Sequence, residues 1–217
     1  MADIFQEVDE EVRREQLKKL WDRYGLLVVI LAILIVAGVG GWRFYQYWEN
    51  QKAAAAGAQF EQAVALADAG KAKEAEAAFA KIATESAAGY RVLARLRAAA
   101  GLSEQDAKGA AAAYNKIADD NTVDQSLRDV AALRAGLLMV DSASLADMQK
   151  RLDPMAAPGQ PFRHTARELL ALSAWRNHDV AATKRYLDMI TDDPETPPGT
   201  RSRADVLAAL LAANGKS

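Results

Sequence analysis

The most prominent feature of the hydropathy pattern is an uninterrupted apolar run near the N-terminus. No charged residue stands between Arg23 and Arg43, and eleven of the residues at 24–42 are Leu, Ile or Val. As a helix, this run spans about 28 Å, close to the hydrocarbon thickness of a bilayer. A buried helix of a water-soluble domain is the alternative, but such helices are rarely apolar on every face. The run therefore predicts a transmembrane helix.

The residues after the run favour a retained anchor over a cleaved signal peptide. A signal peptide ends in small residues of the Ala-x-Ala type, whereas residues 42–48 read Trp-Arg-Phe-Tyr-Gln-Tyr-Trp. With Trp21 near the other end, these aromatic side chains are typical of the two membrane–water interfaces. We therefore predict an anchor over residues 24–48. Its marker positions are Tyr24, Leu26, Ile30, Ile33, Val36, Trp42 and Trp48.

The distribution of Lys and Arg predicts the orientation of this anchor. Five basic residues precede the run, and only Arg43 and Lys52 follow it within a similar distance. Because positive charge is retained in the cytosol, residues 1–23 are predicted to be cytosolic and residues 53–217 to lie across the membrane. In a bacterium, this makes the chain a single-pass inner-membrane protein with most of its length in the periplasm.

The segment ahead of the run carries a helical pattern of its own. Phe5, Val8, Val12 and Leu20 recur at helical spacing, and acidic residues precede basic ones as the helix dipole favours. Two interpretations stay open for this segment. It is an amphipathic helix lying on the inner membrane surface, or it is a docking helix for a partner protein.

Beyond residue 53 the apolar pattern repeats with a period near 35 residues. Segments 75–83 and 110–118 share a small residue, an aromatic four positions later and an Ile three positions after that, and 182–190 matches less well. These positions share one helical face, where the small residue allows close approach and the aromatic fills the gap between helix pairs. The third copy has Gln149 at the aromatic position. The repeat-packing positions are Ala75, Phe79, Ala110, Tyr114, Ala182 and Tyr186.

This period resembles the tetratricopeptide repeat, whose closing proline corresponds to Pro194 here. The resemblance implies a right-handed α-solenoid of about four helix pairs, with a concave groove that binds a segment of another protein. An alanine-rich helical bundle is the alternative, which the regular phase disfavours. A capping box at Thr122–Gln125 is expected to open the third pair. First helices are predicted at 59–69, 90–100, 126–140 and 163–177, second helices at 73–86, 107–119, 144–152 and 180–191, and a capping helix at 204–213.

Composition agrees with an all-α fold: a cytosolic helix, one transmembrane helix, and the repeats with their cap. The chain is rich in alanine, its net charge is −2, and it has no cysteine. Alanine favours helix, and the absence of cysteine excludes disulfides. No basic excess points to nucleic acid.

No pattern of catalytic or metal-ligating residues stands out. The two histidines lie fourteen residues apart, and no nucleophile elbow is present. Arg91 and Arg95 are candidates to line the groove and hold acidic segments, although a solvated charged face is the simpler interpretation. We expect no enzyme, no cofactor, no metal and no small-molecule substrate.

The order of the parts resembles the ancillary SecYEG translocon subunit family of bacterial inner membranes. The resemblance rests mainly on the Asp-Ile-Phe-Gln-Glu-Val-Asp-Glu-Glu-Val head at 3–12 and the Gly-Trp-Arg-Phe-Tyr-Gln-Tyr-Trp end of the anchor at 41–48. It implies an auxiliary role in protein export, with the repeats contacting the SecYEG translocon, periplasmic chaperones and exported chains. An envelope-assembly scaffold and a stress-regulatory protein with other partners are the alternatives.

Overall fold

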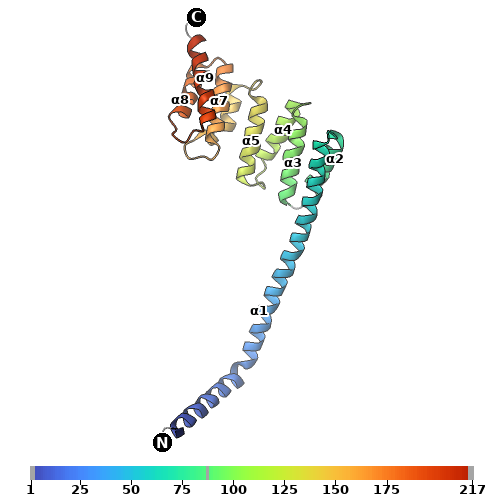
Figure 1. The fold of residues 1–217 in the computed structure, drawn as a ribbon, viewed down its shortest axis with the longest axis vertical. Helices are drawn as coiled ribbons and strands as arrows, with labels where there is room; N and C mark the ends of the chain where they lie inside the picture. Colours follow the sequence, from blue (N-terminus) through green and yellow to red (C-terminus); the bar gives the residue numbers. More distant parts are fainter. Residues whose placement is uncertain (1–2, 87, 215–217) are drawn as a thin grey trace. The chain divides into compact units, whose positions relative to one another are not determined.

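The computed structural model describes residues 3–86 and 88–214. Within these residues the chain is entirely helical, with nine α-helices and no strand, and the predicted all-α class is confirmed (Figure 1). The helices are α1 (Asp3–Asp68), α2 (Ala72–Glu85), α3 (Ala88–Leu102), α4 (Ala107–Ala118), α5 (Gln125–Met139), α6 (Leu145–Ala156), α7 (Arg163–Arg176), α8 (Val180–Thr191) and α9 (Pro198–Asn214).

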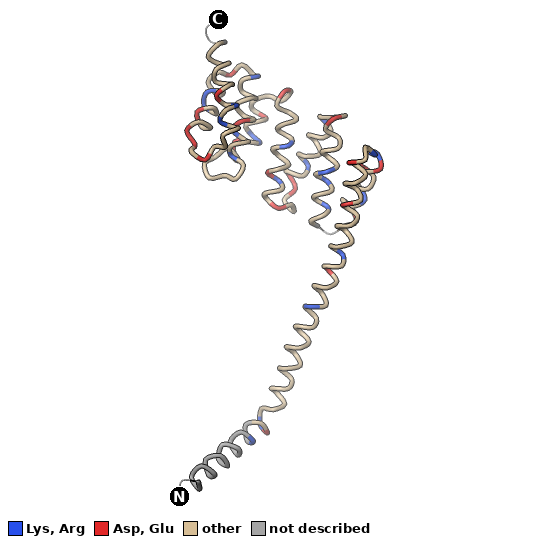
Figure 2. The backbone as a smooth tube through the Cα atoms, in the orientation of Figure 1, with Lys and Arg blue, Asp and Glu red and all other residues tan. Residues whose placement is uncertain are grey.

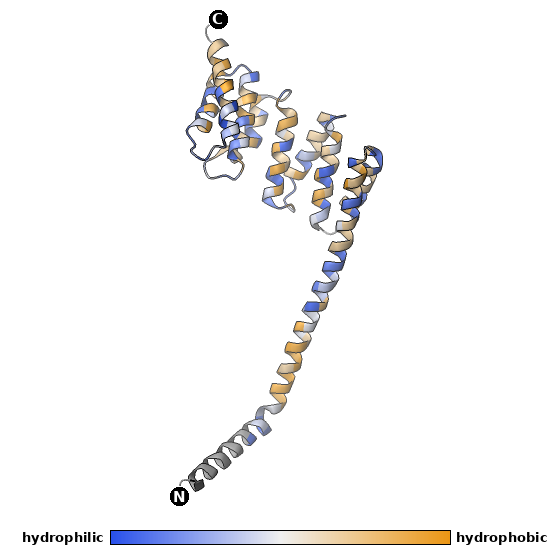
Figure 3. Ribbon diagram, viewed as in Figure 1, coloured by the Kyte–Doolittle hydropathy of each residue, from blue (hydrophilic) through white to orange (hydrophobic). Residues whose placement is uncertain are grey.

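By its internal contacts the chain divides into two units, residues 1–54 and 55–217. The first unit is the N-terminal part of α1, whose apolar stretch has almost no buried side chains (Figure 3). Leu26 is 75% exposed and Val36 is 71% exposed. Among the described residues, this is the one helix long and apolar enough to cross a membrane. It is compatible with a single-pass anchor, and its orientation stays a prediction.

The predicted head and anchor belong to one continuous helix. α1 shows no break at residue 23 or between residues 48 and 53, so the predicted domain limits correspond to no helix end. The predicted apolar face of Phe5, Val8, Val12 and Leu20 lies outside the residues whose side chains are described. α1 ends just before Gly70, which adopts a left-handed φ of 74° that glycine tolerates without strain.

In the second unit, short polar side chains cap the N-termini of several helices. Asp106 accepts the Gly109 N–H at the start of α4, and Asp179 accepts the Ala182 N–H at the start of α8, both at 2.8 Å. The predicted capping box at Thr122–Gln125 is wrong. Asp124 caps α5 through the Ser126 N–H at 2.9 Å, while the Thr122 hydroxyl is engaged with Asp120 in the preceding turn.

The core of this unit is a series of three clusters, each shared by neighbouring helix pairs. The first is formed by the end of α1, α2 and α3, the second by α3, α4 and α5, and the third and largest by α5 to α9. Phe79 and Ile82 of α2 occupy the positions in the first cluster that Tyr114 and Ile117 of α4 occupy in the second. Each pair therefore completes its core only when the next pair packs on it.

The third copy packs differently because its second helix lacks an aromatic. α6 buries Met148, Leu152 and Met155, and it continues through Pro154 beyond the predicted end at residue 152. A Cβ atom at Gly136 of α5 would lie 3.1 Å from Leu152 Cδ1, so this glycine permits the close approach of α5 and α6.

Gln149, at the missing aromatic position, is used for a polar contact with the fourth copy. Its side-chain amide donates to the Tyr186 hydroxyl at 3.1 Å, and that hydroxyl donates to Asp153 at 2.8 Å. Burial is the main cause that raises the pKa of Tyr186, so the hydroxyl stays protonated and keeps donating. These bonds connect α6 to the buried aromatic of α8.

Candidate functional site

A cavity of about 430 Å³ opens between the end of α1, α2 and the C-terminal half of α3. Phe79 of α2 lines it, and the ring of Phe60 meets Phe79 edge-on with ring centres 5.6 Å apart. Small side chains such as Ala67 and Ala98 make up part of the lining. Its charged side chains are three acidic and two basic ones, namely Asp68, Glu76, Glu104, Lys73 and Arg97. The small side chains leave the space unfilled next to Phe79, which is itself buried.

Exposed aliphatic and basic side chains are also present on α3 and α5. On α3, Leu93 and Arg97 are exposed one helical turn apart, and Arg97 also lines the cavity. On α5, Arg134 and Leu137 are exposed three residues apart. Leu93 is 39% exposed and Leu137 is 54% exposed.

The structure does not bring the two predicted groove arginines to this cavity. Arg95 donates to Asp120 at 2.7 Å and to the Lys116 carbonyl at 3.3 Å, which joins α3 to the end of α4. Hydrogen bonds from Thr122 and Arg95 lower the pKa of Asp120 to about 2. Arg91 is exposed and is not among the residues that line the cavity.

The arginine that does line the cavity, Arg97, was missed by the sequence reasoning. A signal for it exists in the chain: Leu93 and Arg97 recur 37 residues later as Val130 and Arg134. Ala94 follows Leu93 and Ala131 follows Val130, and both alanines are fully buried. The two helices therefore turn equivalent faces toward the core. A comparison of first helices, in place of second helices, would have revealed this correspondence.

Five of the six predicted repeat-packing positions belong to the core clusters of the second unit, and Ala110 is buried outside them. Five of the six side chains are buried, and Ala182 of α8 is half-buried against the third cluster. The predicted anchor positions all lie on α1 and are exposed. The buried packing positions are Ala75, Phe79, Ala110, Tyr114 and Tyr186.

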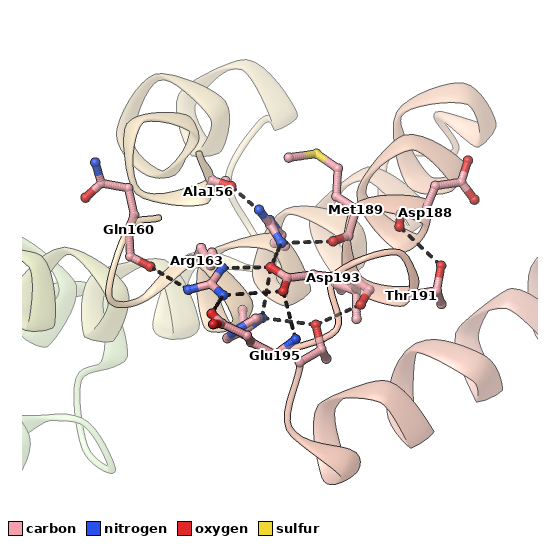
Figure 4. A network of polar contacts seen from close by, with 12 residues as sticks. Ala156, Gln160, Arg163, Asp188, Met189, Thr191, Asp193 and Glu195 are labelled. Atoms are coloured by element: carbon pink, nitrogen blue, oxygen red, sulfur yellow. Dashed lines mark hydrogen bonds and ion pairs between the residues drawn. The ribbon is translucent and has the colours of Figure 1, made fainter. Parts of the chain in front are cut away.

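A network of hydrogen bonds and ion pairs lies near the C-terminal end of the second unit (Figure 4). Arg167 is buried and donates to the carbonyls of Ala156 and Met189 at 2.8 and 2.9 Å and to Asp193 at 2.8 Å. Arg163 donates to Asp193 at 2.7 Å, and these bonds hold the pKa of Asp193 well below its ordinary range. The network fastens the loop before α9 onto α7.

A shallow cavity of about 870 Å³ lies beside this network. Its lining contains both arginines of the network and Asp193, together with exposed basic and acidic side chains of α8. Both arginines are already engaged, by Asp193, Glu195 and main-chain carbonyls, so this region is a structural junction.

The histidines contribute to no cluster of metal ligands. Across residues 3–86 and 88–214, no group of three or more His, Cys, Asp or Glu side chains is placed to hold an ion. His164 Nδ1 lies 3.1 Å from the Thr196 hydroxyl, and His178 sits in the turn between α7 and α8 with a φ of 59°. Burial lowers the pKa of His164.

Consecutive helix pairs with a shared core and an open cleft define a helical-repeat protein. The chain belongs to the tetratricopeptide repeat-like domain family, whose family model matches residues 18–170. Domains of this kind are generally non-enzymatic folds for protein–protein interaction. Searches among curated proteins and among solved structures gave no match.

Proposed function

We propose that the protein is a membrane-tethered scaffold for protein–protein interactions. Residues 24–48 anchor it in a bacterial inner membrane, and residues 53–217 form a periplasmic recognition domain. The observation that carries the proposal is the extent of the family match, which runs from residue 18 to residue 170 and so includes the apolar helix together with α2 to α6. The apolar helix is then part of the family's architecture, and its exposed Leu, Ile and Val side chains need a hydrocarbon environment.

The partner that we propose is the Sec translocon, with the repeat domain linking the channel to periplasmic chaperones during protein export. The head at 3–12 and the anchor end at 41–48 support this partner through their resemblance to the ancillary SecYEG translocon subunit family. Tethering contributes to the mechanism because it raises the effective concentration of the repeats near the channel exit, to about millimolar for short linkers. Contacts that are weak in solution then become effective.

The test of the partner is crosslinking of the full-length chain in cells, followed by purification in a mild detergent and mass spectrometry. We expect translocon subunits and at least one periplasmic chaperone to be recovered. A matched control carries the same tag on the anchor with residues 53–217 removed. Loss of the chaperone from this control is expected. Absence of every translocon subunit from the full-length sample would reject the Sec assignment, and recovery of envelope-assembly factors or a cytosolic regulator would assign the alternative role.

The test of the topology is independent of the partner. An alkaline phosphatase fused after residue 60 is expected to be active, because the enzyme folds only in the periplasm, and alkaline washing is expected to leave the chain in the membrane. An inactive fusion, or release of the chain by the wash, contradicts the anchor.

A further inference from the structure

The outer side of α9 is apolar, and no described helix covers it. Its inner side carries Ala204 and Leu207, which are buried in the third cluster where α9 packs on α7 and α8. On the outer side Val206 is 60% exposed and Leu210 is 47% exposed. The closing helix of a repeat array needs a polar outer side, and a helix that is apolar on opposite sides is normally covered on both. The outer side of α9 therefore has the character of a contact surface.

The earlier repeats show what covers this side of an equivalent helix. α9 packs on α8 and α7 as α7 packs on α6 and α5, which makes α9 the first helix of a fifth pair. The first helices α3, α5 and α7 are each packed against their own second helix, α4, α6 and α8. No second helix follows α9 within the described residues. A packed helix is therefore the shape that fits the uncovered side of α9.

Four exposed residues form a stripe along this side, which we call the α9 stripe. They are Ser202, Val206, Ala209 and Ala213. The steps between them are four, three and four residues, the spacing at which two packed helices meet along their length. Three of the four side chains are small, so the backbone of a second helix can approach closely, and Val206 is the side chain that projects toward it.

The charge of α9 indicates which helix fits the stripe. No charged residue occurs at 206–214, and Figure 2 shows the last turns of α9 without a basic or acidic position. A two-fold axis brings the same patch of two copies together, so a charge near the axis would face a like charge. The α9 stripe avoids this repulsion, and it offers no charge by which a different protein could be selected. A second copy of the chain is therefore the occupant that fits, and mutual coverage leaves no stripe open to extend the assembly.

The one acidic residue beside the stripe sets the direction of the pairing. Asp205 is exposed next to Val206, near the start of the stripe. In a parallel pair the two Asp205 carboxylates would lie at the same level and repel each other. In an antiparallel pair each Asp205 lies opposite the uncharged end of the other helix, and each Val206 meets the small side chain of Ala209.

The size of the stripe indicates that this pairing depends on the membrane. A single helix face of this length is much smaller than the roughly 800 Å² per partner of stable complexes, so the contact is weak between free copies. The anchor proposed at residues 24–48 confines the copies to one membrane and raises their effective concentration. The inference rests on this part of the proposed function.

We propose that two copies of this protein pair through α9, with their α9 stripes packed antiparallel about a two-fold axis. The pair then presents two repeat domains from one membrane site. A partner that carries two binding segments is held by both domains at once, so weak single contacts combine into stronger binding.

The test uses disulfide crosslinking, because the natural chain has no cysteine. Full-length single-cysteine variants are reconstituted in lipid vesicles, oxidised with copper phenanthroline and separated on a non-reducing gel. In the antiparallel register, the two copies of residue 209 are offset by about 5 Å along the helices, within reach of a disulfide. Ala209→Cys should therefore give a covalent dimer.

A second cysteine position on the same stripe provides the matched control. The two copies of residue 202 lie about 16 Å apart along the helices in this register, too far for a disulfide. Ser202→Cys alone should stay monomeric, although its side chain is equally open to solvent. A mixture of Ser202→Cys and Ala213→Cys chains should crosslink, because these positions face each other.

A charge placed on the stripe should separate the copies. In the Ala209→Cys background, Val206→Asp brings two like charges together and is expected to lower the linked fraction about tenfold. Ala112→Asp, at an exposed alanine of α4, is the control and should leave the linked fraction unchanged. Circular dichroism verifies that each variant is folded.

The proposal is overturned if Ala209→Cys gives no dimer, if Ser202→Cys alone crosslinks equally well, or if Val206→Asp has no effect. Alkaline washing of the same vesicles separates this failure from failure of the anchor. A chain that stays in the vesicles without crosslinking leaves the anchor standing and rejects the pairing. A chain that the wash releases rejects the anchor, and the pairing that depends on it is rejected as well.

Discussion

The contact between Gly136 of α5 and Leu152 of α6 leads to a quantitative prediction about the packing of the third repeat. Leu152 is fully buried. Leu152→Ala removes three carbon atoms from the core, which is about 2.4 kcal/mol at 0.8 kcal/mol for each methylene-sized group. The cavity left behind adds to this, so we expect a loss of about 3 kcal/mol in the free energy of unfolding.

The effect of Gly136→Ala depends on whether Leu152 is present. Alanine is favoured over glycine inside a helix by about 1 kcal/mol. In the wild-type core the new Cβ would lie 3.1 Å from Leu152 Cδ1, and overpacking of this kind costs about 1–3 kcal/mol, so Gly136→Ala should be neutral or destabilising. In the Leu152→Ala background that methyl group is absent. The same substitution should then stabilise the protein by about 1 kcal/mol.

The measurement is thermal unfolding of the full-length chain in detergent, followed by circular dichroism, for the wild type, the two single variants and the double variant. For a domain of this size 1 kcal/mol corresponds to about 2–4 °C in Tm. Leu152→Ala should lower Tm by roughly 6–12 °C, and adding Gly136→Ala should recover about 2–4 °C.

A distant glycine provides the control for this cycle. Nothing lies within 4 Å of a Cβ placed at Gly101 in α3, so Gly101→Ala should change Tm equally with and without Leu152→Ala. If Gly136→Ala is also additive with Leu152→Ala, close approach of the two helices is not the reason for glycine at this position.

Three further predictions concern polar contacts of the second unit. Tyr186→Phe removes the hydrogen bond to Asp153 and should lower the free energy of unfolding by about 1 kcal/mol, a drop of about 2–4 °C in Tm; an unchanged Tm contradicts the role of that bond. Arg167→Met leaves two main-chain carbonyls without their donor and should cost about 2–4 kcal/mol, measured by the same melt; a loss below 1 kcal/mol argues against a fastening role. Asp120→Asn removes a carboxylate whose folded-state pKa is lowered to about 2, so its stabilisation is present above about pH 4 and is lost as the pH falls toward 2. The Tm difference between wild type and Asp120→Asn should therefore shrink over this interval, and a constant difference contradicts the assignment.

Much of the helical layout was predictable because the breaks between helices are chemically marked. The predicted second helix of the fourth pair, residues 180–191, coincides with α8, since Asp179 caps its start and Pro194 follows its end. The predicted cap at 204–213 was too short, because α9 begins at Pro198, a residue suited to the first turn of a helix. Capping at the third pair was misassigned because Thr122, Asp124 and their neighbours all have side chains that bond nearby main-chain groups.

The candidate site was less predictable, because helical spacing does not indicate which faces of a helix are buried by neighbouring helices. Arg91, Arg95 and Arg97 all belong to α3, and each is compatible with a groove on sequence alone. The packing of α2 on one side and α4 on another decides among them, by engaging Arg95 with Asp120 and leaving Arg97 at the cavity. That arrangement depends on contacts between residues far apart in the sequence.

The unequal size of the three core clusters affects how readily each end of the repeat unit opens. The first cluster contains few buried side chains and borders a cavity, whereas the last one extends over α5 to α9 and is fastened by Arg167. In a linear array, a module gains stability mainly from its immediate neighbours, so brief local opening should concentrate in α2 and α3. A partner that occupies the cavity would order this loose end. Its arrival would then be visible as slower amide hydrogen exchange in these two helices, even without any change of fold.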